Sequence, residues 1–197
     1  MEKYRLSSWL IVHLIGGIVA ATLETKFQFL GTLILAGLPI AVGQGIVLRY
    51  ALRYSLVESW CWIGALALGW PIGHLIYVNS QRWSAPLIDL VNLLPFAWEV
   101  FGINVIRLSV VLGFIGLVQW LVVVRRRQPT FGTWGFGWPL LNGLAGAVLG
   151  GATATVCRIA CDALAATGGT LMLSVVLGAS GWGLYALVTY PYVADHP

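Results

Sequence analysis

The chain alternates long apolar runs with short polar segments, and this pattern predicts helices that cross a membrane. Six runs come close to or exceed the roughly 20 residues that a membrane-spanning helix needs. They cover residues 6–23, 27–48, 57–78, 103–124, 132–155 and 164–190. We therefore expect an all-α fold: a polytopic transmembrane helix bundle that forms one domain over residues 1–197.

Two segments allow a second interpretation: residues 79–102 and the first apolar run. Residues 79–102 mix apolar with polar positions and include Pro86 and Pro95. We expect an outer interfacial loop there, with a short amphipathic helix, and not a seventh span. The first run follows a basic N-terminus, as in a secretory signal, but no small-residue cleavage site follows it. We therefore expect it to be a retained helix.

Composition narrows the class of protein. The chain is 59% hydrophobic and 9% charged, with a mean hydropathy of +0.87, whereas soluble domains carry about 25% charged residues. This excludes an ordinary soluble enzyme, a nucleic-acid-binding protein and a disordered chain. The expected surroundings are a lipid bilayer, without a nucleic-acid partner.

The basic residues predict the orientation, because cytoplasmic loops carry an excess of Lys and Arg. With the N-terminus inside, seven fall on the inner side: Lys3, Arg5, Arg49, Arg53, Arg125, Arg126 and Arg127. Three fall on the outer side: Lys26, Arg82 and Arg158. We expect both termini in the cytoplasm, with the protein in a bacterial inner membrane or a thylakoid membrane. An aromatic belt near the inner surface would consist of Trp9, Trp60, Trp62, Trp120 and Trp134.

An internal repeat is the next expectation. Gln44 is followed after 16 residues by Trp60, and Gln119 is followed after 15 residues by Trp134, with an arginine between the two in each copy. Both copies run from outside to inside and back, which predicts a parallel repeat with a pseudo-axis along the membrane normal. The two Gly-Trp-Pro triplets, at 69–71 and 137–139, do not fit this register.

The second copy, Gly-x-x-Gln-Trp-Leu-Val followed by arginine from Gly116 to Arg125, resembles a pattern in uncharacterised bacterial, often cyanobacterial, multispan membrane proteins. The resemblance covers the glutamine hairpins, and the first copy departs from it with Gly45 where the second has Trp120. It implies this architecture and no particular activity.

Several uncharged polar residues lie inside the apolar runs and are candidate binding residues. Gln44, Gln119 with the adjacent Trp120, and Asn142 could bond neighbouring helices. They could also line a seat for a polar ligand near the inner end of the bundle. Both interpretations stay open from the sequence, with helix–helix bonding the favoured one.

Two histidines lie in the spans and raise the question of a tetrapyrrole cofactor. His13 lies near the inner end of its run and His74 near the outer end of its own. Their levels differ by roughly 14 Å at 1.5 Å per residue, so they cannot be the two axial ligands of one ring. Single ligation of a pigment or haem by either remains an alternative to a hydrogen-bonded histidine.

Arg107 and two cysteines complete the candidates. Arg107 lies near the outer end of the fourth run, where it could anchor the helix at the interface or form an anion or substrate site. Cys157 and Cys161 would share one helical face. A disulfide within one helix is geometrically awkward, so we expect two unreactive residues, and no metal site.

Enzyme motifs are missing from the sequence, and the acidic residues lie at span ends or in loops. We expect a non-enzymatic accessory or scaffold subunit of a membrane complex, with other membrane subunits or a second copy as partners and lipid or pigment as candidate ligands. The alternative is the substrate-binding component of a carrier, comparable in size and span number to the specificity components of energy-coupling vitamin transporters.

Overall fold

The computed structural model describes residues 2–93, 96–127 and 137–195, and the elements within these ranges are helices. They are α1 (Glu2–Leu30), the π-helix η1 (Gly31–Leu35), α2 (Gly37–Tyr50), α3 (Leu56–Asn92), α4 (Phe96–Gln119), the π-helix η2 (Trp120–Val124), the short α5 (Arg125–Arg127) and α6 (Gly137–Asp195). The expected all-α class is confirmed.

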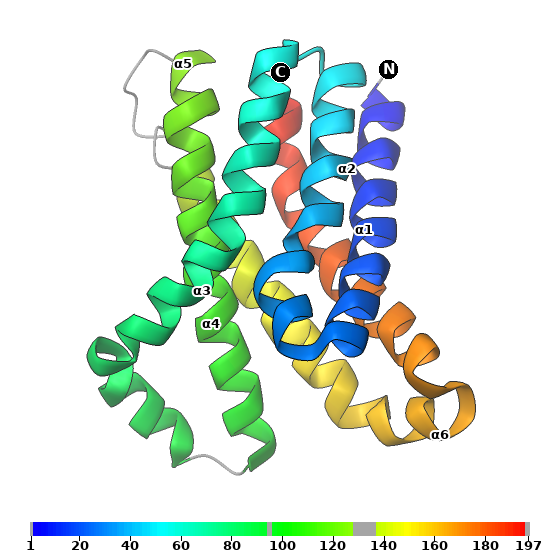
Figure 1. Ribbon diagram of the computed structural model, residues 1–197, viewed down its shortest axis with the longest axis vertical. Coiled ribbons are helices and arrows are strands. Elements are labelled where there is room, and N and C mark those ends of the chain that lie inside the picture. Colours follow the sequence, from blue (N-terminus) through cyan, green and yellow to red (C-terminus); the bar gives the residue numbers. More distant parts are fainter. Residues whose placement is uncertain (1, 94–95, 128–136, 196–197) are drawn as a thin grey trace.

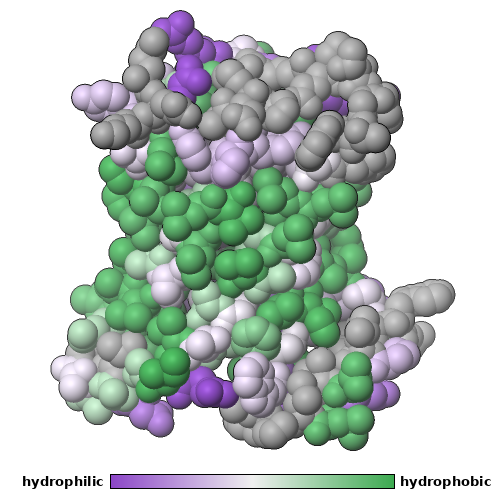
Figure 2. All heavy atoms as spheres, turned by 180° about the vertical axis from the view of Figure 1, so that it is seen from behind, coloured by the Kyte–Doolittle hydropathy of each residue, from purple (hydrophilic) through white to green (hydrophobic). Residues whose placement is uncertain are grey.

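Six stretches of these helices are long and apolar enough to cross a membrane. They are Tyr4–Gln28, Gly31–Tyr50, Leu56–Ser80, Trp98–Val124, Gly137–Ala163 and Gly169–Val193. Figure 2 shows the corresponding surface: apolar residues form a band around the middle of the molecule, and polar residues gather towards its two ends. The protein is therefore a transmembrane helix bundle in contact with lipid.

Helices extend beyond the apolar runs in two places. The expected interfacial loop over residues 79–102 is largely helical, because α3 continues to Asn92 and α4 begins at Phe96. The fifth and sixth spans form one element, α6, which turns at Gly169, where φ is +62°. Glycine is suited to this left-handed backbone because it has no Cβ.

Both ends of the described chain lie at one end of the bundle, which is also the end that holds α5 (Figure 1). The turn between α1 and α2 and the turn of α6 lie towards the opposite end. α6 packs against α1 and α4, while α3 packs against α2 and α4. At the α1–α6 contact, a Cβ on Gly17 would lie 2.5 Å from the carbonyl oxygen of Gly178, so only glycine permits this approach.

A capping box starts α3 at the same end as the termini. The backbone N–H of Ser55 donates to Glu58 Oε2 at 2.7 Å, and the N–H of Glu58 donates to Ser55 Oγ at 3.2 Å. This reciprocal pair satisfies two donors that the first helical turn leaves without intrahelical acceptors. The Ser-x-x-Glu spacing carries this information in the sequence.

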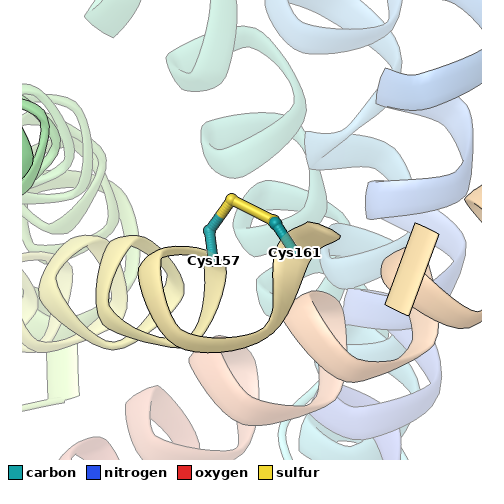
Figure 3. The surroundings of a disulfide bond; sticks show 2 residues. All are labelled: Cys157 and Cys161. Carbon is teal, nitrogen blue, oxygen red and sulfur yellow. A yellow bond between two sulfur atoms is a disulfide. The ribbon is translucent and has the colours of Figure 1, made fainter. Parts of the chain in front are cut away.

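The structure corrects the expectation for the two cysteines of α6. Cys157 and Cys161 form a disulfide across one turn of the helix, with Cα atoms 4.4 Å apart (Figure 3). Both cysteines precede the turn of α6 at Gly169, and this turn lies towards the end of the bundle opposite the termini (Figure 1). A separation of four residues can therefore be bridged when the local turn brings the Cα atoms this close.

The expected aromatic belt is also wrong for three of its members. Trp9, Trp62 and Trp120 are buried in the core with Trp138 and do not line the membrane surface, whereas Trp60 is exposed. Trp134 lies outside the described residues. The tryptophans near the inner end of the spans are thus mainly core residues, and several use their indole N–H groups inside the bundle.

Candidate functional site

A directional chain of hydrogen bonds joins α1, α2, α3 and α6 in the half of the bundle near the termini. His13 Nδ1 lies 2.7 Å from the carbonyl oxygen of Trp9, which can only accept, so Nδ1 carries the proton and Nε2 accepts. Gln44 Nε2 donates to His13 Nε2 at 2.8 Å, and Trp62 Nε1 donates to Gln44 Oε1 at 2.8 Å. Trp9 Nε1 donates to Thr189 Oγ1 at 3.1 Å. Both ring nitrogens of His13 are therefore engaged.

A second chain joins α4 and α6. Trp138 Nε1 donates to Gln119 Oε1 at 3.0 Å, Asn142 Nδ2 donates to the carbonyl oxygen of Trp138 at 3.1 Å, and the Tyr185 hydroxyl donates to Asn142 Oδ1. Gln119 Nε2 is buried and has no hydrogen-bond partner among the described residues. This chain is therefore incomplete at its glutamine.

Each glutamine bonds a tryptophan of the next span, as expected, but the tryptophan differs from the expected one. The tryptophans that bond them are Trp62 and Trp138, at separations of 18 and 19 residues, and not Trp60 and Trp134. Trp120 is buried at the start of η2 and packs in the same core. Gln44, Gln119 and Asn142 thus bond helix to helix, as one of the two interpretations expects, and the repeat stays a prediction.

The second histidine repeats the local arrangement of the first. His74 Nδ1 lies 3.0 Å from the carbonyl oxygen of Trp70, four residues earlier, so Nδ1 carries the proton here too. The side chain is 4% exposed, and its Nε2 is buried without a partner among the described residues. A buried acceptor without a donor is costly, and it faces an environment that could supply one.

That environment is a cavity of about 150 Å³ between α1, α3, α4 and α6. It lies in the half of the bundle away from the termini. Its polar and aromatic lining residues are Glu24, Thr25, Trp70, His74, Arg107, Thr153, Ser174 and Trp182. The cavity combines a carboxylate, a guanidinium and an imidazole inside the apolar part of a membrane protein, where such groups mark functional sites.

Arg107 contributes directly to this cavity. Its Nη2 donates to Asn104 Oδ1 at 3.1 Å, one turn away on α4. Its Nε is buried and has no hydrogen-bond partner among the described residues. Glu24 lines the same cavity and is attracted electrostatically by Arg107. Of the two expected roles for Arg107, anchor or binding site, this position favours the binding site.

Sequence reasoning missed Glu24 because it assigned residues 24–26 to a loop. In the structure α1 runs through this position, and the chain then reverses at Gln28, where φ is +45°, into η1. A Cβ on Gly31 would lie 2.3 Å from the carbonyl oxygen of Leu23, so glycine lets the chain fold back tightly beside Glu24. A lone Gln-x-x-Gly spacing gives little warning of such a turn.

Neither histidine has the surroundings that a tetrapyrrole cofactor needs. His13 has no free nitrogen for an iron or magnesium ion, because both nitrogens are hydrogen-bonded. His74 Nε2 is open, but a cavity of about 150 Å³ is smaller than the pockets of drug-sized ligands, at about 300–1,000 Å³, and does not fit a tetrapyrrole ring. No group of three or more metal-ligating side chains occurs within the described residues.

The geometry therefore separates the candidate residues into two sets. His13, Gln44, Gln119 and Asn142 belong to hydrogen-bond chains between helices, whereas His74 and Arg107 line the cavity. Comparison of the chain with protein-family models, with curated proteins and with solved structures found no match.

Proposed function

We propose that this protein is a non-enzymatic integral membrane protein that binds a small polar solute in the cavity lined by Glu24, His74 and Arg107. It would act as the substrate-binding component of a carrier. The single observation that carries the proposal is His74 Nε2, a buried acceptor that has no partner in the described part of the chain and that lines a cavity already containing two charged side chains. A bound solute would supply the missing hydrogen bond.

A comparison of His74 with His13 supports a ligand at His74. There the same Trp-x-x-x-His unit has its Nε2 filled by the amide of Gln44. Buried polar groups are nearly always paired in folded proteins, and the protein meets this requirement at His13 with its own side chain. At His74 the partner would be a ligand.

Two features support a cytoplasmic location for both termini in this proposal. The positive charges favour the end of the bundle that holds the termini and α5. The Cys157–Cys161 disulfide precedes the turn of α6, which lies towards the other end, and disulfides persist in oxidising compartments. The solute cavity would then lie in the extracytoplasmic half of the membrane.

Cysteine labelling tests this orientation. Thr167 is exposed in the turn of α6 and Tyr50 is exposed at the end of α2. In a Cys61→Ala background, Thr167→Cys should react with a membrane-impermeant maleimide in intact cells. Tyr50→Cys should react only after the cells are opened, and the reverse result would overturn the orientation.

Thermal unfolding in mild detergent, with a library of small polar solutes, tests the binding function. A solute that binds only the folded state adds about 2.7 kcal/mol at 100 times its Kd, which raises the midpoint of unfolding by several degrees. His74→Leu should abolish the rise. His13→Leu is the matched control, because it changes the same residue type outside the cavity and should preserve the rise. A library without a single stabilising solute would contradict the proposal.

The accessory role is a second candidate, favoured by an apolar groove of about 330 Å³ between α3 and α4. Its lining residues are Cys61, Gly64, Ala65, Leu68, Gly69, Ile72, Phe114, Val118 and Val122. The groove lies within two spans, so an acyl chain of a tightly held lipid is the occupant that its hydrocarbon lining suits. A Cβ on Gly64 would meet no heavy atom within 4 Å, so Gly64→Leu should displace that lipid in native mass spectrometry without unfolding the bundle.

A further inference from the structure

The hydrogen-bonding groups of the cavity between α1, α3, α4 and α6 divide into acceptors and donors. Glu24 offers a carboxylate that is paired with no hydrogen-bond donor of the described residues, and His74 offers the lone pair of Nε2. Arg107 supplies donors only, and its Nε is unpartnered among the same residues. The cavity therefore presents a negative acceptor set and a single positive donor.

Three hydroxyl groups also line the cavity. Thr25 Oγ1 donates to the carbonyl oxygen of Ala21 at 2.8 Å, and Thr153 Oγ1 donates to that of Leu149 at 2.9 Å. Ser174 Oγ donates likewise within its own helix. Thr25 Oγ1 and Ser174 Oγ also lie 3.0 Å apart and are hydrogen-bonded to each other. Of the three hydroxyls, Thr153 Oγ1 uses its proton on backbone carbonyls and offers lone pairs to a ligand.

Charge complementarity then limits the kind of solute. No ion pair within 4.0 Å joins Glu24 to Arg107 in the described part of the chain, although both line one cavity and attract each other. A simple anion would face the Glu24 carboxylate, and a simple cation would face Arg107. A molecule with an ammonium and a carboxylate compensates both charges and brings no net charge into the apolar region, where net charge is costly.

The size of the cavity limits the solute further. At about 150 Å³, it is smaller than the pockets of drug-sized ligands, at about 300–1,000 Å³. Trp70 and Trp182 lie side by side with ring centroids 6.0 Å apart and form an apolar wall. A small solute with an ammonium, a carboxylate and a short aliphatic group suits this space.

Resting on the proposed binding function, we propose that the solute is a small zwitterionic amino acid. Its ammonium group donates to Glu24 and to His74 Nε2, and its carboxylate accepts from Arg107.

Four probes of similar size test the solute class with purified full-length protein in detergent: L-alanine, propionate, ethylammonium and glycerol. L-alanine should raise the midpoint of thermal unfolding, and the other three should not do so at the same concentration. Propionate or ethylammonium acting as strongly as L-alanine would overturn the zwitterion inference.

Two variants should switch the preference, which a structural role alone would not do. Glu24→Gln should lower the affinity for L-alanine roughly tenfold or more and make propionate the better ligand. Arg107→Gln should make ethylammonium the better ligand. Asp162→Asn and Arg126→Gln are the matched controls, because both residues are exposed and lie outside the cavity.

The outcomes separate this inference from the binding function on which it rests. If another solute of the library stabilises the protein and His74→Leu abolishes that effect, while L-alanine has none, binding stands and the zwitterion is wrong. If the library contains no stabilising solute, the binding function itself fails.

Discussion

Trp9 with His13 in α1, and Trp70 with His74 in α3, form the same local unit in two halves of the bundle. In both, the histidine follows the tryptophan by four residues, and its Nδ1 bonds the tryptophan carbonyl oxygen, at 2.7 and 3.0 Å. In both, the two rings pack at centroid distances of 4.5 and 5.2 Å. The difference lies at Nε2, which Gln44 fills at His13 and which has no partner among the described residues at His74.

The difference teaches that the local motif fixes a tautomer and not a function. A carbonyl at Nδ1 forces the proton onto that nitrogen and leaves Nε2 as an acceptor. What then approaches Nε2 depends on the neighbouring helix. α2 brings an amide to the first unit, whereas the second faces a cavity. One Nε2 is therefore paired inside the bundle, and the other lines a cavity without a partner among the described residues.

Replacing Gln44, which bonds His13 Nε2, should have the largest effect on stability. Gln44→Leu leaves both His13 Nε2 and Trp62 Nε1 without partners, because Gln44 bonds both. We expect a loss of about 1–3 kcal/mol in the free energy of unfolding. Unfolding by sodium dodecyl sulfate in mixed micelles measures it, and an unchanged midpoint would show that the chain contributes nothing.

Replacing His13 itself should have the next largest effect on stability. His13→Leu leaves only Gln44 Nε2 unpartnered, so we expect a loss of about 1–2 kcal/mol. The double variant with Gln44→Leu should cost less than the sum of the two, because both changes remove one shared bond. Strict additivity in this cycle would contradict the bond.

Gln119 can be compared with Gln44, because its Nε2 has no partner among the described residues. Gln119→Leu leaves Trp138 Nε1 without an acceptor, but it also removes the unpartnered Nε2. We expect a smaller loss, about 0.5–1 kcal/mol, in the same micelle measurement. A cost equal to that of Gln44→Leu would mean that Gln119 Nε2 has a partner in the membrane.

Replacing His74 should have the smallest effect on the stability of the protein without solute. His74→Leu removes an acceptor that has no donor, so the free energy of unfolding without solute should change by less than about 0.5 kcal/mol. The same variant should lose the stabilisation by solute that the parent shows. A loss as large as that of His13→Leu would show that His74 is a structural histidine.

The sequence predicted the class of the fold well because its signal is repeated along the chain. Each apolar run is an independent indication of a helix in lipid, where backbone polar groups must be satisfied internally. The structure differs from the expectation at ends and turns: the helix expected within residues 79–102 is a continuation of α3 to Asn92, and Cys157 and Cys161 form a disulfide. There the outcome depends on a local change in backbone direction and not on periodicity.

The candidate site was predicted in part. His74 and Arg107 were identified because few polar residues lie inside the apolar runs, so each could be recognised without knowledge of its neighbours in space. Glu24 was missed, since a carboxylate four positions before the reversal at Gln28 looks like a loop residue. The belt of tryptophans was misplaced because the sequence cannot distinguish a ring at the lipid interface from a ring in the core.

The sequence by itself determined that the chain enters a membrane as six helices, because hydrophobicity and length act on each segment separately. It also determined the hydrogen-bonding potential of each His, Gln and Arg. Tertiary structure decided which of these groups meet. The tight reversal at Gly31 holds Glu24 beside the chain that follows it, and the cavity collects Glu24, His74 and Arg107 from three helices. Pairing between distant segments depends on helix packing and register, which no single segment encodes.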